Sequence, residues 1–323
     1  MDRRVGRATA ELCGAVIGAG FASGREIAAF FAEYGRWGWL GVIVAGAVIG
    51  AMCLSLMRSR GEAGMPGAWK GRWQEWLWRG MFTSLMAATG GAMLAGGGEI
   101  AALLLPVRFA RAMGMGMTLA AAWVMSEGEG RLLPVVSRGL LLCLVGVALA
   151  GLFMPARTAA CMGQSGGPEG ILMGLCYGGF NVALAAPVMA HWGGRLTEGE
   201  RRRCAVGVVA VLTALLACGH AVLLRHTALM DEQLPFVMLL APCGRWGYAL
   251  AGTALYLAAL TTLTACLRGL RTMVNRGFPL AVVAVAALSL SGLDELVDVV
   301  YPVLGGGCFL LLMAARRQNR TKM

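Results

Sequence analysis

The sequence contains few charged residues for its length. Asp, Glu, Lys and Arg make up 14% of its 323 residues, whereas soluble domains carry about 25%. Hydrophobic residues reach 58%, and the mean hydropathy is +0.69. Because a soluble domain of this size cannot bury so much apolar surface, the composition excludes a soluble globular protein and predicts a multi-pass protein of the lipid bilayer.

Motifs for nucleotide hydrolysis and for zinc-dependent hydrolysis are lacking. The sequence has no G-x-x-x-x-G-K-[ST] loop and no H-E-x-x-H. These absences argue against ATP-driven transport and against a membrane enzyme. We therefore expect no catalytic residue and no cofactor.

Metal-binding and nucleic-acid-binding patterns are also lacking. None of the ten cysteines forms a C-x-x-C pair, and most lie in apolar runs, as small buried side chains do. The three histidines lie at or near the ends of apolar segments without metal-ligand spacing. The net charge of +11 does not indicate a nucleic-acid partner, because the basic residues are spread over loops without an interleaved aromatic patch.

Long apolar segments, by contrast, follow one another along the whole chain. A window of about 19 residues, long enough to cross a hydrocarbon core of roughly 30 Å, selects ten of them. The first lies behind a basic flank and is too long for a signal peptide, so we expect an uncleaved span. The predicted spans are 9–32, 37–57, 80–105, 112–126, 132–154, 169–191, 204–224, 246–267, 278–292 and 296–315.

The Lys and Arg residues assign an orientation to these spans. With the N-terminus inside, 21 of them fall on the inner side and 6 on the outer side. Cytoplasmic loops keep the positive charge, so we expect a protein of the cytoplasmic membrane with both termini cytoplasmic, ending in a basic tail at 316–323. The oligomeric state stays open.

Two spans contain glycine-rich interruptions. Span one reads "GAGFASG" at 18–24, and span six reads "LCYGGFNVALAAP" around Gly178 and Gly179. A break at membrane depth is tolerated where protein or a water-filled cavity satisfies the freed backbone groups, which can then bind ions and solutes. The alternative is that these glycines only form close-packed helix faces.

The positions of the two interruptions predict an internal symmetry. Spans one and six begin two halves of five spans each, 1–155 and 156–315. Five is odd, so the halves lie in opposite orientations across the membrane. Matching interrupted spans in inverted halves are typical of transporter binding sites.

The stretch "VIGAGFASGREI" resembles the first-span signature of the YkvI-like amino-acid permeases, a branch of the amino acid/polyamine/organocation transporters. The resemblance implies the leucine-transporter fold, an all-α protein of two inverted five-helix repeats with helices 1 and 6 interrupted. It covers the chain in span count and layout. The specific motif is confined to span one and, more weakly, to Asn181.

The resemblance also implies a sodium site made by span eight, where sodium-coupled relatives carry A-x-x-[ST]-[ST]. Span eight reads "YLAALTTLTACL" and supplies Ala258, Thr261 and Thr262 at this spacing. The alternative is that each threonine bonds a carbonyl of its own helix. Some relatives replace sodium by a lysine amine of span five, which has no lysine here. A proton carried by a carboxylate stays open.

Two carboxylates lie within the spans, where a charge is costly and indicates function by default. Glu26 follows the first interruption, and Glu99 lies toward the outer end of span three. Glu26 can coordinate a cation, carry a coupled proton or bind a substrate amine. The structural alternative is an ion pair with Arg25 or with a neighbouring helix.

Together these patterns predict an ion-coupled secondary transporter of a small solute, an amino acid or related amine, that works by alternating access. Phe21, Tyr177 and Phe180 are candidate gates. A non-transporting scaffold or sensor, or a channel, is the alternative. The residues predicted to bind the solute are Gly18, Ala19, Gly20, Phe21, Ala22, Ser23, Gly24, Tyr177, Gly178, Gly179, Phe180 and Asn181; those predicted to bind sodium or couple an ion are Ala258, Thr261, Thr262, Glu26 and Glu99.

Overall fold

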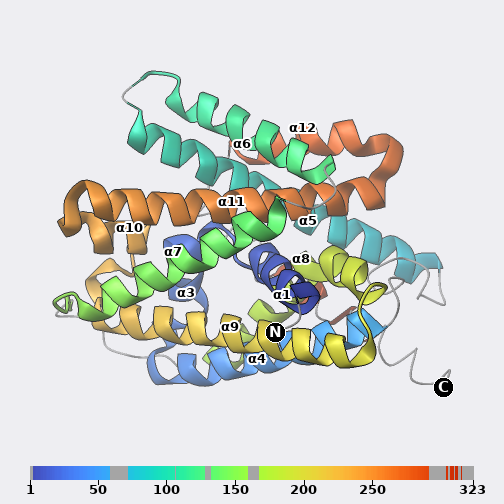
Figure 1. The fold of residues 1–323 in the computed structure, drawn as a ribbon, viewed down its shortest axis with the longest axis horizontal. Coiled ribbons are helices and arrows are strands. Elements are labelled where there is room, and N and C mark those ends of the chain that lie inside the picture. Colours follow the sequence, from blue (N-terminus) through green and yellow to red (C-terminus); the bar gives the residue numbers. More distant parts are fainter. Residues whose placement is uncertain are drawn as a thin grey trace.

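The computed structural model describes residues 3–58, 72–105, 107–127, 132–158 and 167–290, with short pieces between 303 and 314. Within these residues the chain is all-helical (Figure 1). The tail 316–323 and most of predicted span ten lie outside the described residues. The count of ten spans and the inverted repeat therefore stay predictions.

Each of predicted spans one to nine coincides with a helix or a run of helices. Five helical stretches are long and apolar enough to cross a membrane by length and composition: Arg25–Arg58, Leu133–Phe153, Glu169–Gly193, Glu198–Arg225 and Pro235–Leu288. The longer helices are α1 (Arg3–Val16), α4 (Gly35–Arg58), α5 (Arg72–Leu104), α6 (Ala110–Glu127), α7 (Leu133–Phe153), α8 (Glu169–Gly193), α9 (Glu198–Arg225), α11 (Gly244–Val274) and α12 (Phe278–Leu288). The shorter elements are α2 (Ala19–Ser23), α3 (Arg25–Phe30), η1 (Ala32–Tyr34), η3 (Thr227–Leu229), α10 (Pro235–Leu240), η4 (Ala241–Cys243) and η5 (Asn275–Gly277).

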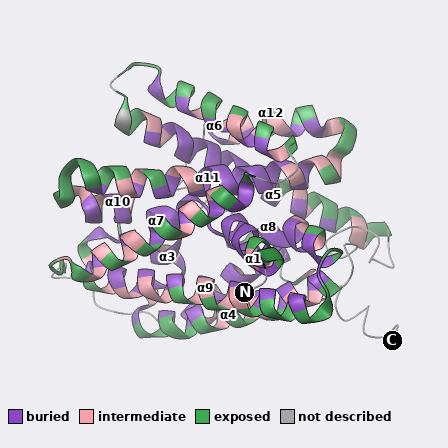
Figure 2. Cartoon of the chain, in the orientation of Figure 1, coloured by how far each residue is buried: buried purple, intermediate pink, exposed green. Residues whose placement is uncertain are grey.

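The helices form two groups with α1 and α8 between them (Figure 1). In one group α4 packs against α8 and α9, and in the other α5 packs against α6, α11 and α12. Figure 2 shows buried residues concentrated at α1, α8 and the inward faces of α5 and α11, and exposed residues on the outward faces. The interrupted first span thus lies in the interior, where side chains of other helices surround it.

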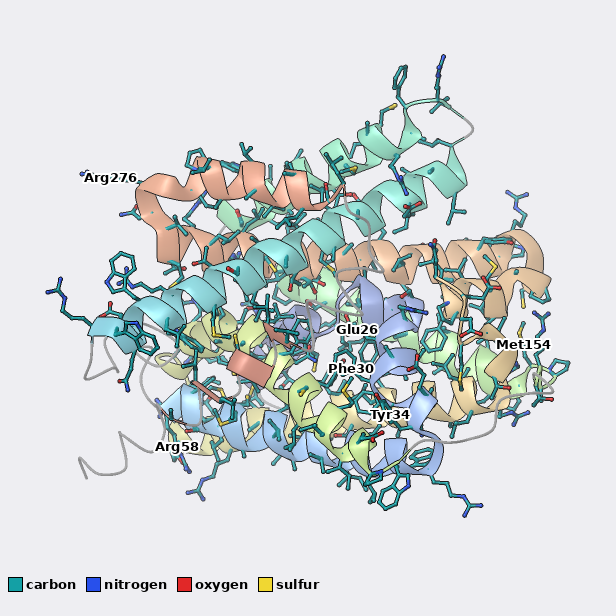
Figure 3. All side chains as sticks on the ribbon, turned by 180° about the vertical axis from the view of Figure 1, so that it is seen from behind. Glu26, Phe30, Tyr34, Arg58, Met154 and Arg276 are labelled. Carbon is teal, nitrogen blue, oxygen red and sulfur yellow. The ribbon has the colours of Figure 1, made fainter. Side chains whose placement is uncertain are left out.

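The ends of the helices agree with the predicted alternation of the spans across the bilayer. Figure 3 shows Arg58 and Arg276, both predicted on the inner side, at one end of the molecule and Met154, predicted on the outer side, at the other. At the end that carries Arg58, α9 begins with a capping box in which the Thr197 N–H donates to Glu200 Oε2 at 2.8 Å. A capping box satisfies N–H groups that have no partner within the helix.

The prediction that span six is interrupted is wrong in this structure. Helix α8 runs without a break from Glu169 to Gly193, through Gly178 and Gly179. The reason is packing against α4, because a Cβ at Gly178 would lie 2.8 Å from Cβ of Val48. A Cβ at Gly174, one turn earlier, would lie 2.7 Å from Cα of Gly41. These glycines let two helix backbones approach closely, which is the small-residue packing of membrane helices.

The stretch 228–242 is too short to span the bilayer, and its sequence predicts a re-entrant or capping helix. The structure has a short helix there, α10, which packs beside the first span. Helix α10 packs against α11, and the ring of Phe236 lies over Gly24, where a Cβ would be 3.1 Å from Cδ1. The Arg25 guanidinium donates from Nη1 to the Met230 carbonyl at 3.4 Å. Both contacts join the middle of the first span to the segment 226–243 between α9 and α11. This segment therefore covers Gly24 and Arg25.

The loop 59–78 contains four tryptophans, and its sequence predicts a short amphipathic segment anchored at the membrane interface. Residues 59–71 lie outside the described residues, and 72–78 form the first turns of α5. Trp73 and Trp76 are 74% and 73% exposed, as side chains at a membrane interface are, whereas Trp78 is buried at 1%. Residues 72–78 thus belong to the N-terminal part of a long helix.

Candidate functional site

The first span is broken at two places in the interior of the protein. Helix α1 ends at Val16 and α2 begins at Ala19. Helix α2 in turn ends at Gly24, whose φ of +90° lies in the left-handed region that favours glycine. Helix α3 then begins at Arg25. The interruption at 18–24 therefore agrees with the prediction from sequence, and it leaves backbone groups in the last turn of α1 without helical partners.

Thr262 of α11 satisfies carbonyl groups at the end of α1. Its hydroxyl donates to the Ile17 carbonyl at 3.1 Å and lies 3.4 Å from the Gly14 carbonyl. Thr261 behaves differently, because its hydroxyl donates to Leu257 and Ala258 within α11, at 3.0 and 3.1 Å. Of the two threonines predicted at the ion site, the structure brings Thr262 to the break and turns Thr261 toward its own helix.

Met93 of α5 also reaches the break, and the sequence reading did not identify it. The Ala19 N–H, at the start of α2, donates to the Met93 sulfur at 3.0 Å. The Met93 methyl would lie 3.2 Å from a Cβ at Gly18. We expected the break to present free N–H groups, but a thioether, a weak acceptor, lies against this one. A lone methionine in an apolar helix gives no signal in the sequence that it meets a backbone 74 residues away.

Glu26 of α3 is the carboxylate nearest the break. It is 1% exposed, and Figure 3 shows it in the interior of the bundle. A Cβ at Gly20 would lie 2.5 Å from Glu26 Oε1 and 2.7 Å from its Cγ, so only glycine leaves room for this carboxylate. Within the described residues Glu26 forms no ion pair, and its Oε2 has no hydrogen-bond partner. The structural alternative, an ion pair of Glu26 with Arg25 or with a neighbouring helix, is therefore not observed among the described residues.

Tyr177 of α8 faces the same carboxylate, and Asn181, one helical turn further along, lies against Tyr177. The Tyr177 hydroxyl interacts with the side chains of both Glu26 and Asn181 but closes no hydrogen bond of standard geometry with either. The Asn181 amide nitrogen donates to the Tyr177 carbonyl at 2.9 Å, one helical turn away. Tyr177 and Asn181 are both 0% exposed. Three buried polar side chains thus meet with unsatisfied atoms, which native proteins usually avoid.

Aromatic rings enclose this polar cluster. The Tyr177 ring contacts Phe30 and Phe31 edge to face, with centroids 5.3 and 5.1 Å apart. Phe180 lies 6.5 Å from the Tyr177 ring, and Phe21 is 2% exposed. The rings exclude water and so strengthen polar interactions inside. The positions of Phe21, Tyr177 and Phe180 fit gates that close over a small solute. They fit equally well with side chains of a packed core.

The other predicted site residues lie in two different settings. Ala22, Ser23, Gly179 and Ala258 are buried, and the Ser23 hydroxyl donates to the Gly20 carbonyl at 3.0 Å within α2. Glu99, by contrast, forms an ion pair with Arg111 of α6, and its side chain is 35% exposed. The structure therefore places Glu99 in a contact between α5 and α6 near the surface.

A cleft lies between α1, α8 and α11. Its volume is about 360 Å³, and its polar lining includes Glu11, His191, Arg268 and Thr272. Glu11 is 4% exposed and accepts a hydrogen bond from Trp192 Nε1 at 2.8 Å. Arg268 attracts Glu11 electrostatically and donates to the Met125 carbonyl of α6 at 2.8 Å. The sequence reading missed this network, because its members come from distant parts of the chain.

Solved structures of a manganese transporter from Eremococcus coleocola are similar to this chain. One, in complex with an aromatic bis-isothiourea substituted compound, has a TM-score of 0.57 at 14% identity and covers 96% of this chain and 76% of that chain. A variant with a histidine replaced by alanine has a TM-score of 0.54 at 14% identity, and covers 96% and 77%. A variant with a glutamate replaced by alanine has a TM-score of 0.56, again at 14% identity, and covers 96% and 76%.

The identity is low, so these likenesses show the fold alone. A search of protein-family models and a search of curated proteins found no match. The chain is thus a multi-pass helical protein with the fold of a membrane transporter.

Proposed function

We propose that the protein is an ion-coupled secondary transporter that moves a small solute, an amino acid or related amine, by alternating access. The observation that carries the proposal is the buried break in the first span, between Val16 and Ala19, with polar side chains directed at it. Irregular backbone at this depth is typical of solute and ion sites. The transporter fold of the similar structures supports the same class of function.

The proposed coupling ion is sodium, held by oxygen atoms at the end of α1. Thr262 Oγ1 lies 3.1 Å from the Ile17 carbonyl oxygen and 3.4 Å from the Gly14 carbonyl oxygen. Hydroxyl and carbonyl oxygens are suitable ligands for a hard cation. Thr261 and Ala258 belong to the proposed site by the resemblance. Thr261 would have to turn its hydroxyl toward the ion, which the two favoured rotamers of a helical threonine permit.

Contacts on the two sides of the break support alternating access. On the outer side Phe236 covers Gly24, and the Met230 carbonyl holds Arg25. On the inner side a cleft of about 360 Å³ opens along α1, α8 and α11. In the proposal this is a state closed outside and opening inside, in a cytoplasmic membrane with both termini cytoplasmic. The two halves 1–155 and 156–315 are proposed as the inverted repeats.

Manganese is the alternative substrate that the similar structures raise, because they belong to a manganese transporter. In the described residues no three His, Cys, Asp or Glu side chains come together as ligands for a metal ion. The break is faced by one carboxylate, Glu26, and one thioether, Met93. This ligand set gives a doubly charged ion only half the charge compensation it needs.

A thermal-shift screen tests the proposal. The full chain in detergent is heated with amino acids and aliphatic amines, each in NaCl and in the same concentration of KCl. A substrate that binds the native state raises Tm, and sodium coupling makes the rise larger in NaCl. The sodium-linked site is wrong if the shifts persist unchanged in Thr261→Ala and Thr262→Ala. Absence of any shift, and of uptake into liposomes under sodium or proton gradients, would favour a scaffold or sensor. Flux that neither saturates nor responds to those gradients would identify a channel.

A further inference from the structure

We propose that Glu26, Tyr177 and Asn181 form a subsite that recognises a single primary ammonium group of the transported solute. This inference rests on the proposed transport function and names the chemical group of the solute that the site would bind. The three side chains come from α3 and α8. None of them is more than 1% exposed, so whatever satisfies them is bound inside the protein.

The charge of Glu26 is the first reason. Its carboxylate lies between Gly20 and Tyr177, and within the described residues no basic side chain pairs with it. The neighbouring Arg25 side chain instead extends to the Met230 carbonyl of the outer loop. An isolated carboxylate in this setting is costly unless a bound partner neutralises it. The site therefore has one negative charge to offer and takes a ligand with one positive charge.

The hydrogen-bonding balance of the cluster is the second reason. Glu26 Oε2 and Asn181 Oδ1 are buried acceptors without donors. The Asn181 amide nitrogen is already used by the Tyr177 carbonyl, and that bond fixes which end of the amide faces the cluster. The remaining donors of the cluster are the Tyr177 hydroxyl, which has no partner of standard geometry, and the second N–H of the Asn181 amide, fewer than the lone pairs that Glu26 and Asn181 offer. A ligand that fits must bring several N–H donors, as a primary ammonium does.

The surroundings favour an ammonium over a metal ion. Beside Glu26 the walls are the aromatic rings of Phe30, Phe31 and Tyr177. Aromatic faces attract organic cations and supply no ligand atoms for a metal. A divalent ion at one carboxylate would also keep one uncompensated charge in the interior. A primary ammonium satisfies both the charge and the acceptor atoms.

The test compares amines that differ only at nitrogen. The full chain in detergent is titrated with n-butylammonium chloride and the L-amino acids, and each compound that raises Tm is compared with its N,N,N-trimethyl counterpart. Trimethylation keeps the charge and removes the N–H donors. We expect it to weaken binding about 10- to 100-fold, the range for charged hydrogen bonds. Manganese chloride serves as the divalent probe, and we expect no shift that depends on Glu26.

Variants locate the effect at the cluster. Glu26→Gln keeps the shape and removes the charge, and we expect at least about 10-fold weaker amine binding. Tyr177→Phe keeps the ring packing and should weaken binding less. The matched control is Glu127→Gln, whose exposed carboxylate is paired with Arg271 of α11, and it should bind amines as the wild type does.

Several results would overturn the inference. They are equal binding of the trimethyl compounds, unchanged binding in Glu26→Gln with a native Tm, or a manganese shift lost in that variant. In the first two cases amines still bind, so the proposed transport function survives, whereas the third result assigns Glu26 to a divalent metal ion. If no amine or amino acid shifts Tm at all, both proposals fail together. If Glu26→Gln does not fold, the decision rests on Tyr177→Phe and on the trimethyl series in the wild type.

Discussion

Replacement of Thr262 by valine removes one hydroxyl group from the contact between α11 and the end of α1. Valine keeps the branched shape, so the packing changes little. The lost group is the one that donates to the Ile17 carbonyl at 3.1 Å and approaches the Gly14 carbonyl at 3.4 Å. Both oxygens lie at the end of α1, where helical donors run out.

The structure gives the size of the expected effect. Leaving a buried acceptor without its donor costs about 1–3 kcal/mol. With an unfolding entropy of about 2.1 cal/mol/K per residue, a chain of 323 residues loses roughly 1.5 °C of Tm per kcal/mol, so we expect Thr262→Val to lower Tm by roughly 1.5–4.5 °C. The matched control is Thr264→Val. The Thr264 hydroxyl is buried too, but it donates to the Leu260 carbonyl of its own helix at 2.7 Å. That carbonyl keeps its helical N–H partner, so the loss should stay under about 0.5 kcal/mol.

The assay is thermal unfolding of the purified variants in the same detergent, in NaCl and in KCl. Besides the lower Tm, Thr262→Val should lose any stabilisation that sodium gives over potassium, whereas Thr264→Val should retain it. Equal Tm losses in the two variants would refute the assignment of Thr262 to the break. A sodium effect that persists in Thr262→Val would refute its role as an ion ligand.

Further predictions concern packing and the inner end of the bundle. Gly178→Ala places a Cβ within 2.8 Å of an α4 side chain and should cost about 1–3 kcal/mol. Gly80→Ala, with nothing within 4 Å, should stabilise by about 0.5–1 kcal/mol, as comparison of the two Tm values can show. Trp192→Phe deprives Glu11 of its 2.8 Å hydrogen bond and should cost about 1.5–3 kcal/mol. The same change made in a Glu11→Leu background should cost clearly less, which a double-mutant cycle on Tm can measure.

The break in the first span could be predicted from the sequence because its cause is local. Three glycines at 18, 20 and 24 weaken the helix, and Gly24 adopts the positive φ that other residues avoid. Glu26 could be selected for the same reason, since a carboxylate in an apolar run stands out. The break in span six could not be judged in this way. Gly178 has the same local signal, but its neighbour in space is Val48, 130 residues earlier in the chain.

The partners of the site residues were the least predictable part. The spacing of Ala258, Thr261 and Thr262 identified the helix that meets the break. It did not show that only the Thr262 hydroxyl bonds to α1 residues, whereas the Thr261 hydroxyl bonds within its own helix. Met93 at the break and Trp192 on Glu11 depend on how distant helices pack. No local pattern specifies such contacts.

Uptake by reconstituted protein tests the central claim most directly. The full chain is placed in liposomes, and the entry of the labelled amino acid or amine that gives the largest thermal shift is measured with an inward sodium gradient. The account predicts saturable accumulation above the external concentration, lost when sodium is equal on both sides and lost in Thr262→Val. Accumulation that is the same with and without the sodium gradient, or that Thr262→Val leaves unchanged, would contradict it.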